Sequence, residues 1–533
     1  MTLDQRAGRE PVRISDLVSA SELPARAEAL LSAGFRLALV AGHDDGPGDG
    51  PVERPVERPV ERPVAGRRNG QVTGHRLRVV YVFCAGPPDR RVELQVCLDP
   101  DRPRVPSLAA WSFPASRFER ELFDLYGVEP VGHPFLRPLV RHQHWPRHWH
   151  PMRRDAGPMP PMRTDAEPFP FAAVEGPGVY EIPVGPVHAG LIEPGHFRFF
   201  VVGETILKMK ARLWFVHRGI EKLFEGRPLD EGVALAERIS GDTAAGHTLA
   251  YCLAVEEALH VEVPHDARLL RALVVELERI TNHVADLGAL CNDVGFGVAQ
   301  ARALTLREKL LRLAGEVTGH RLLRGAIRPG AAVLRRLPTE AELADVAAGV
   351  EEIVELATSN TVVMDRFEGT AVLSRRDAEA IGVLGVVARA SGIAVDARLA
   401  HPSFDLGTGP VPAFEEIIEE AGDVLARFTV RAREVAASLD LVAELAGHVR
   451  SLESSAREVP RRGGSGLGIV EGWRGTIVHR VEVDAGGRLA RVKVVDPSFL
   501  TWPALSVALA DTIVPDFPLA NKSFNLSYAG NDL

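Results

Sequence analysis

Two pairs of hydroxyl side chains share one spacing and lie far apart in the sequence. Ser240 and Thr243 belong to the stretch RISGDTAAGHTLAY, and Ser498 and Thr501 belong to DPSFLTW. Cysteines at this x-x spacing would offer four thiolates to a metal, because clustered sulfur ligands are typical of such sites. Serine and threonine stand there instead, so the two segments pose the question of what these hydroxyls bind or hold.

A histidine and a glutamate form the next candidate group. His217 and Glu221 are four residues apart in HRGIEKL, with Arg218 beside them. Packed inward on a helix, they could relay protons. On an outer face they would be a solvated set of ion pairs, and spacing alone favours that interpretation. His247 and Tyr251 are also four apart, and a core role is the default for both.

The cysteines and the remaining histidines show no metal-ligand spacing. The four cysteines include no C-x-x-C pair, so the sequence predicts neither a zinc site nor an iron–sulfur cluster in this chain. Each is expected to be a small buried apolar side chain in a reducing compartment. Four histidines of residues 141–170 are expected to face solvent or a partner, namely His142, His144, His148 and His150.

Length and composition indicate an ordinary globular chain of more than one domain. It has 533 residues, 46% hydrophobic and 25% charged, with a net charge of −9. Nothing suggests a basic surface for nucleic acid. The first residues lack the apolar core of a signal peptide, and no long uncharged apolar run predicts a spanning helix. Any link to a membrane must therefore come through a partner.

Residues 1–150 predict a small α/β domain, followed by a Pro/His-rich linker over 151–178. A PVER repeat, in a loop assigned to 44–72, places proline at every fourth position and predicts an exposed extended loop. The expected elements are a helix at 21–33 capped by Ser21, strands at 35–42, 75–84 and 91–98, and a helix at 114–127.

Residues 179–533 predict a mainly helical bundle with small β portions, which makes the whole chain α+β. Apolar residues recur at steps of three and four over 266–294, as in a bundle seam. The other expected elements are two short strands near 180–210, a helix at 412–448, strands at 475–495, a short helix and an irregular tail.

Several segments, in order, carry a family resemblance. They are GPVHAGLIEPGHFRF, HRGIEKL, ERISGDTAAGHTLAYCLAVEEAL, ELERITNHVADLGALCNDVGF, ARASGIAVDAR and VVDPSF. Residues 179–533 resemble the large subunit of group 4 [NiFe] hydrogenases and the 49 kDa subunit of respiratory complex I. WSFPASRFERELFDLYGVEPVGHPFLRPL resembles the complex I 30 kDa subunit. The fusion of both modules is typical of the hydrogenase-4 and formate hydrogenlyase large subunit.

The resemblance implies that four thiolates are missing. In the hydrogenases the matching positions hold nickel and iron through cysteines, whereas here they are Ser240, Thr243, Ser498 and Thr501. A hydroxyl is hard and neutral near pH 7, so it does not replace a thiolate. We therefore expect no nickel–iron cluster, and an active hydrogenase is the least expected interpretation.

The complex I relatives imply a quinone-like acceptor in the vacated cavity. His188 matches the histidine of their G-P-x-H turn, but their tyrosine falls on Gly241, which has no donor side chain. Ser240, Thr243 or His247 could supply a donor instead. The expected substrate-binding residues are thus His188, Ser240, Thr243, His247, Ser498 and Thr501.

Two further family residues match. Glu221 falls on a proton-passing glutamate, and Arg474 falls on an arginine that points at the cluster, although Trp473 replaces the proline before it. The resemblance thus implies His188, Glu221 and Arg474 as catalytic residues. Glu221 and Arg474 could equally survive as a buried structural ion pair.

The expected partners follow from the same families. They are a small subunit that carries the iron–sulfur clusters, and membrane subunits related to antiporters and to the quinone site. The complex would lie on the cytoplasmic side of the cell membrane. No G-x-G-x-x-G follows a predicted strand, so any use of NAD belongs to another subunit. The alternative function is a non-catalytic architectural or coupling subunit.

Overall fold

The computed structural model describes residues 12–47, 75–171, 173–189, 192–405 and 416–533. It divides into two compact units. The N-terminal unit consists of Arg13–Phe83 and Val92–Glu167, and the C-terminal unit of Cys84–Arg91 and Pro168–Leu533. The first is rich in strands and the second is largely helical, which confirms the predicted α+β class.

The N-terminal unit is built on a four-stranded sheet in the order β1-β4-β3-β2. Its strands are β1 Val12–Leu17, β2 Arg36–Pro47, β3 His75–Ala85 and β4 Arg90–Leu98. It also contains helices α1 Leu23–Ser32 and α2 Phe113–Tyr126, and the short parallel pair β5 Arg104–Pro106 and β6 Glu129–Val131. The run 79–83 of the inner strand β3 is buried throughout, as expected of a strand covered on both faces.

A buried carboxylate of α2 holds the chain that follows the helix. Asp124 Oδ2 accepts hydrogen bonds from the backbone N–H groups of Leu139 and Val140 at 2.7 and 2.8 Å, and Arg141 Nε donates to Oδ1 at 3.1 Å. This satisfies a carboxylate that would otherwise be costly to bury. The unit continues to Glu167, so residues 151–167 of the predicted linker belong to it.

Three local expectations for the N-terminal unit need correction. Ser21 does not cap α1; instead, Ser19 and Glu22 exchange hydrogen bonds just before the helix. Cys97 is exposed, unlike the other three cysteines, because it lies on the outer side of β4. Residues 44–47 belong to β2, and residues 48–72 of the PVER loop lie outside the described residues.

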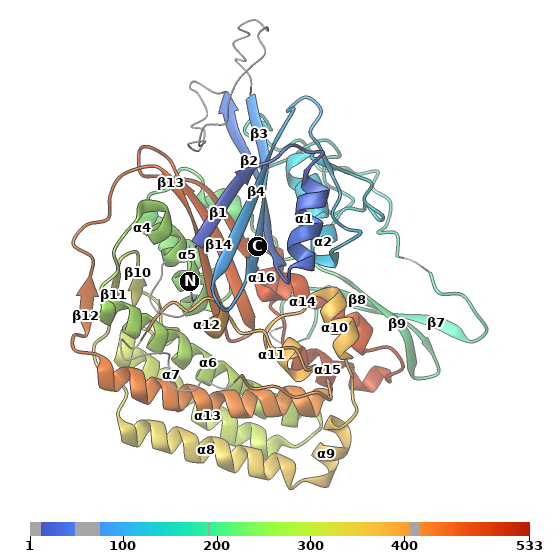
Figure 1. The fold of residues 1–533 in the computed structure, drawn as a ribbon. Coiled ribbons are helices and arrows are strands. Elements are labelled where there is room, and N and C mark those ends of the chain that lie inside the picture. Colours follow the sequence, from blue (N-terminus) through green and yellow to red (C-terminus); the bar gives the residue numbers. More distant parts are fainter. Residues whose placement is uncertain (1–11, 48–74, 172, 190–191, 406–415) are drawn as a thin grey trace, which may run out of the picture. The chain divides into compact units, whose positions relative to one another are not determined.

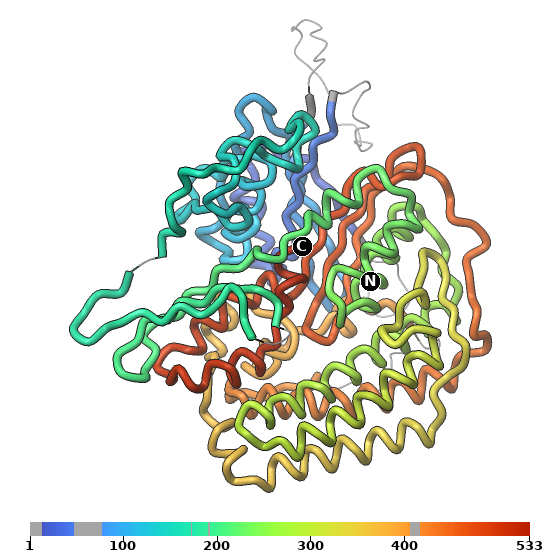
Figure 2. The backbone as a smooth tube through the Cα atoms, turned by 180° about the vertical axis from the view of Figure 1, so that it is seen from behind, coloured from blue at the N-terminus to red at the C-terminus, as the bar shows by residue number. Residues whose placement is uncertain are grey.

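Long helices form the bundle of the C-terminal unit (Figures 1 and 2). They are α5 Ala244–Leu259, α6 His265–Asp293, α7 Gly297–Thr318, α8 Glu340–Thr358 and α13 Val424–His448. The prediction for α6 is confirmed. The prediction for 412–448 is too long, because residues 416–423 are not helical: Asp423 accepts a hydrogen bond from Ala426 N and so caps a helix that begins at Val424. Residues 412–415 lie outside the described residues.

The antiparallel sheet β13-β14-β15 lies against α5. Its strands are β13 Gly464–Gly472, β14 Gly475–Val483 and β15 Leu489–Val495. The sequence does not predict β13, because glycine weakens strand propensity. Its alternate glycines have a packing role: a Cβ at Gly464, Gly466 or Gly468 would lie 2.1, 2.0 or 1.9 Å from a backbone oxygen of α5. Only glycine lets the strand approach the helix so closely.

Shorter elements complete the C-terminal unit. The strands are β7 Val179–Val184, β8 His196–Val202, β9 Thr205–Arg212, β10 Ile327–Arg328, β11 Ala331–Val333 and β12 Glu453–Ser455. The short helices are α3 Ile220–Phe224, α4 Leu229–Ala236, α9 Thr361–Phe367, α10 Arg375–Ile381, α11 Gly385–Ala390, α12 Ala397–Ala400, α14 Pro497–Ala508, α15 Phe517–Phe524 and α16 Tyr528–Asp532.

Two predictions for these shorter elements are wrong. Three strands, not two, are found among the described residues of 179–212, because Gly203 adopts a left-handed conformation and turns β8 into β9. The tail is helical over α15 and α16 rather than irregular, since Pro518 near the start of α15 suits a helix N-terminus. Among the described residues, no helix combines the length and the apolar character needed to cross a membrane.

Candidate functional site

The first hydroxyl pair lies in the loop that leads from α4 into α5. Ser240 Oγ and Thr243 Oγ1 both donate to Asp242 Oδ1, at 2.9 and 3.0 Å. Both hydroxyl residues are buried, whereas the Asp242 side chain keeps 39% of its surface exposed. The loop therefore presents the Asp242 carboxylate, which the buried hydroxyls of Ser240 and Thr243 hold by hydrogen bonds.

The turn between β13 and β14 brings Arg474 and Trp473 to the same carboxylate. Arg474 Nη1 and Nη2 donate to the two oxygens of Asp242, each at 2.7 Å, and Trp473 Nε1 donates to Thr243 Oγ1 at 3.1 Å. Burial opposes ionisation of Asp242, but the guanidinium and the hydroxyl donors outweigh it and hold its pKa below the ordinary range. A Cβ at Gly385 would lie 1.9 Å from the Arg474 carbonyl, so this turn also needs a glycine beside it.

The second hydroxyl pair divides between two neighbours. Ser498 Oγ accepts from Ser527 N at 2.9 Å, whereas Thr501 Oγ1 accepts from Leu384 N at 3.4 Å. Both residues lie on α14 and are buried. The structure therefore connects Ser498, but not Thr501, to the residues around Ser240.

Ser527 is the site residue that the sequence analysis missed. Its hydroxyl lies 2.9 Å from Ser240 Oγ and accepts from Gly530 N at 2.9 Å. The direct partner of the Ser240 loop is thus the SYAG segment at the start of α16. In it Ser527 and Gly530 have the same spacing as Ser240 and Thr243. This spacing could have pointed to Ser527 in the sequence, but Gly530 in place of a second hydroxyl residue hid the similarity.

His247 and Tyr251 are buried in the core, the default position expected of both, whereas the expected substrate-binding role of His247 stays a prediction. Tyr251 donates to Leu229 O at 2.8 Å. His247 Nε2 lies 3.0 Å from Asp496 Oδ2, and its Nδ1 lies 3.0 Å from His479 Nε2. His247 is therefore engaged on both ring nitrogens, one helical turn beyond Thr243.

Glu221 lies in a buried ion-pair group rather than on a solvated face. It contacts Arg491 Nη2 at 2.6 Å and Lys493 Nζ at 3.0 Å, and Val494 N donates to it at 3.0 Å. Burial alone would raise its pKa, but these cations lower it to about 2. His217 precedes the helix, because Gly219 is left-handed, so the expected shared helix face does not form.

His188 follows β7 in a half-buried turn. Its Nε2 donates to Gly195 O at 2.8 Å, and its ring lies 6.0 Å from that of Phe197. A Cβ at Gly195 would lie 2.6 Å from the Tyr528 ring, so this glycine packs against α16. His188 thus neighbours the segment that carries Ser527.

The open side of the cluster lies at Gly241. This residue is exposed, and a Cβ built on it would meet no atom within 4 Å. Beneath the loop, Glu278 of α6 accepts hydrogen bonds from Ala245 N and Gly246 N at 2.7 and 3.0 Å. Burial raises the pKa of Glu278 to about 8, and the nearby negative charge of Asp242 adds to the effect.

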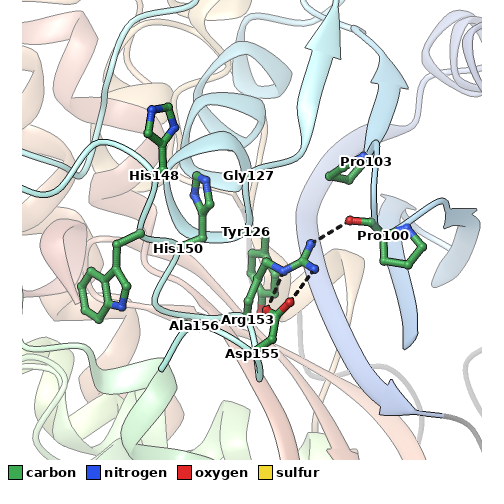
Figure 3. Close-up of a pocket in the computed structure, with 10 residues that line it drawn as sticks. Pro100, Pro103, Tyr126, Gly127, His148, His150, Arg153, Asp155 and Ala156 are labelled. Atoms are coloured by element: carbon green, nitrogen blue, oxygen red, sulfur yellow. Dashed lines mark hydrogen bonds and ion pairs between the residues drawn. The ribbon is translucent and has the colours of Figure 1, made fainter. Parts of the chain in front are cut away.

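A separate cavity of about 360 Å³ lies in the N-terminal unit (Figure 3). Arg153 in its wall is paired with Asp155 at 2.9 Å and donates to Pro100 O at 3.4 Å. His148 is exposed, as expected, but His150 is half-buried beside Asp124 O, and burial lowers its pKa. Arg153 and His150 in the wall are thus paired within the unit, whereas Trp149 Nε1 is buried and has no hydrogen-bond partner among the described residues.

Three family models match successive parts of the chain. They are the 30 kDa subunit of respiratory-chain NADH dehydrogenase over residues 35–161, the nickel-dependent hydrogenases over 218–291, and the 49 kDa NADH dehydrogenase subunit over 293–460. Hydrogenase-4 component G of Escherichia coli (strain K12) is 33% identical over 81% of this chain and 75% of its own length. Formate hydrogenlyase subunit 5 of the same organism is 32% identical over 83% of this chain and 79% of its own length.

The chain belongs to this hydrogenase-4 and formate hydrogenlyase large-subunit family. The C/D subunit of the NADH-quinone oxidoreductase of Phocaeicola vulgatus is also similar, with 31% identity over 66% of this chain and 71% of its own length. A further relative is a chain from the solved structure of the membrane-bound sulfane sulfur reductase, an archaeal respiratory membrane complex. It has a TM-score of 0.60 and 28% identity, covering 67% of this chain and 99% of that one.

Proposed function

We propose that the chain is the large subunit of a membrane-associated hydrogenase-4-like or complex I-like oxidoreductase complex that works without a nickel–iron cluster. In place of the cluster, a quinone-like acceptor would bind beside the Ser240 loop. Family membership supports the role as a large subunit. The neutral oxygen donors of the Ser240 loop and its neighbours support the absence of nickel and iron.

The residues present do not fit a nickel–iron cluster. Ser240, Thr243 and Ser498 offer neutral oxygen, and Ser527 adds another hydroxyl while Gly530 offers no side-chain ligand. Nickel and iron in such clusters require soft anionic sulfur. Each of these hydroxyls is also occupied by a protein hydrogen bond.

The exposure of Gly241, with open space where its Cβ would be, carries the proposal of an acceptor site. An acceptor there would meet the Arg474–Asp242 pair, which is the exposed edge of an otherwise buried polar cluster. Small-molecule sites combine such an opening with a few placed polar groups. Arg474 would stabilise negative charge on the acceptor. His188 would donate a hydrogen bond only by exchanging the one that its Nε2–H makes to Gly195 O.

Glu221 has a narrower role in this proposal. Its carboxylate is ionised and held between Arg491 and Lys493, so it would position β15 and could pass protons only through those partners. Electrons would arrive from iron–sulfur clusters of a small partner subunit. Membrane subunits of the antiporter and quinone-site type would hold the complex on the cytoplasmic face.

The alternative function is an architectural or coupling subunit. The observation that favours it is the complete internal pairing of Ser240, Thr243, Ser498 and Thr501, all of them buried. A cluster that satisfies itself needs no ligand to be stable.

Metal content and turnover test these proposals on the purified complex. Nickel at background with iron present would support a complex without the cluster, and nickel near one per complex would overturn it. Gly241→Trp would place a large ring where a Cβ meets no atom within 4 Å. Loss of quinone-analogue reduction in this variant, with assembly unchanged, would support the acceptor site. Turnover equal to wild type would remove the acceptor from this position.

A further inference from the structure

Three ionisable side chains form a buried hydrogen-bonded line behind the Ser240 loop. His247 of α5 stands in the middle, with Asp496 Oδ2 3.0 Å from its Nε2 and His479 Nε2 3.0 Å from its Nδ1. None of the three is more than 1% exposed. They come from a helix, a helix cap and the middle of β14, so folding alone brings them together.

The far end of this line is unsatisfied. His479 Nδ1 is buried and makes no hydrogen bond to any described residue. The strand neighbours that face His479 are Gly468 and Val494, which have no polar side chain. A buried polar atom without a partner costs stability and calls for an explanation.

The charges around the line favour an ionised Asp496 and a neutral His479 at rest. Burial opposes ionisation of Asp496, but the hydrogen bond from His247 and the charge of Arg474 keep its pKa low. Burial, with the neighbouring His247, holds the pKa of His479 well below its ordinary value. Glu278 of α6 faces the same turn of α5 at Gly246 and is protonated below about pH 8.

The line is joined to the hydroxyl cluster. Asp496 Oδ1 accepts from Ser498 N at 2.8 Å, and Ser498 Oγ accepts from Ser527 N at 2.9 Å. Ser527 Oγ then meets Ser240 Oγ at 2.9 Å. Arg474 acts on both ends, because it binds Asp242 and its charge reaches Asp496.

We propose that Asp496, His247 and His479 form a proton-accepting relay that takes up one proton when negative charge develops at the Ser240 loop. At rest, His247 Nε2–H donates to Asp496 and His479 Nε2–H donates to His247 Nδ1. A proton supplied by solvent to His479 Nδ1 displaces the Nε2 proton, which passes to His247 Nδ1. His479 is then neutral again and His247 is an imidazolium beside the Asp496 carboxylate, so the net charge of the three groups rises from −1 to 0.

The relay rests on the proposed function only for the source of that negative charge, which would be a reduced acceptor. These three residues are positioning and charge-compensating groups rather than catalytic residues, because they touch no acceptor. His479→Gln is the decisive variant, since glutamine fills similar space but cannot carry the proton. His283→Gln is its matched control: His283 is equally buried, is bound to Glu434 at 2.8 Å, and has an unpartnered Nδ1, but has no hydrogen bond to the relay.

Quinone-analogue reduction by the complex, driven by an artificial low-potential donor, gives the first readout. Above about pH 7, where free protons are scarce, His479→Gln should lower kcat about tenfold or more and steepen its fall with pH, with KM little changed. His283→Gln should keep the wild-type pH profile. A folded His479→Gln complex with the wild-type profile would overturn the relay.

Titration of the full chain labelled with ¹⁵N-histidine gives a readout that needs no turnover. Lowering the pH from about 8 to about 5 should shift the His247 and His479 signals in one shared step, and His479→Gln should abolish that step for His247. Separate steps, or none, would overturn the relay even if the complex reduces quinone. A shared step in a complex that reduces no quinone analogue would instead overturn the proposed function alone.

Discussion

Two groups of arginine–carboxylate pairs in the C-terminal unit have the same chemistry and different surroundings. Arg389 binds Glu434 and Glu471 at 2.7 and 2.8 Å, and all three side chains are at most 1% exposed. Arg474 binds Asp242 at 2.7 Å, but that carboxylate is 39% exposed beside the open volume at Gly241. A buried ion pair is therefore not by itself a sign of a ligand-binding site. Of these two groups, only the Arg474–Asp242 pair has a carboxylate that a ligand could reach from solvent.

The largest expected effect lies in the closed group. Arg389→Met should lower the free energy of unfolding by about 3–5 kcal/mol, because it leaves Glu434 and Glu471 buried without their main counter-charge. Urea unfolding of the chain measures this. Arg433→Ala, which breaks an exposed pair with Glu419, should cost less than about 1 kcal/mol. Equal losses in the two variants would refute the distinction.

The open group should tolerate the same kind of change better. Arg474→Ala should cost about 1–3 kcal/mol, since water can reach Asp242 and the Ser240 and Thr243 hydroxyls remain as donors. Turnover of the acceptor should fall by a larger factor than this loss of unfolding free energy alone would cause. Arg474→Lys keeps the charge but loses the two-pronged contact, so it should recover stability and only part of turnover. A loss of stability as large as that of Arg389→Met would make the two groups alike.

Glu278 sharpens the comparison through pH. Its pKa of about 8 in the folded chain exceeds the ordinary unfolded value of about 4.5, so the folded state holds a proton that the unfolded state has lost. The contribution is complete below about pH 4.5 and is lost as the pH rises through about 8. Glu278→Gln should remove this slope and unfold at a higher temperature than wild type above pH 8. Parallel melting curves from about pH 5 to 9 would contradict it.

The smallest effect is expected at Gly241. Gly241→Ala should change the free energy of unfolding by less than about 0.5 kcal/mol, because its Cβ enters open space and its φ is not positive. Gly385→Ala is the contrasting variant, since its Cβ would overlap the Arg474 carbonyl and its φ is +64°. Differential scanning calorimetry of both variants measures the gap. A marked loss at Gly241 would mean that this side of the cluster is closed.

Periodicity predicted the larger elements, and the motifs singled out the Ser240 loop, whose role as a site stays a prediction. The α6 stripe was predicted almost to the residue because one buried face repeats along the whole helix. The strand β13 was missed, since its glycines serve a contact with α5 that only the fold reveals. Ser527 was missed for a related reason: its importance comes from meeting Ser240, which lies 287 positions earlier in the chain.

The charges were predicted less well than the elements. Spacing placed Glu221 on a solvated face, but its partners Arg491 and Lys493 lie on a strand about 270 residues away and bury it. Local sequence cannot indicate such a partner. The hydroxyl pairs, by contrast, stand out by residue type and spacing, and the absence of a nickel–iron cluster that the family resemblance implies for them stays a prediction.

The glycine contacts of β13 with α5 have a consequence for how the protein could work. They fix the spacing between the helix that begins after Thr243 and the hairpin that carries Arg474 and His479, because the two backbones are already in contact at these glycines. Backbone motion is thus a poor way to switch this region between oxidised and reduced forms. Structures of the complex trapped in the two redox states should superpose closely over Gly464–Gly472 and Ala244–Leu259, with the difference confined to side chains and protons.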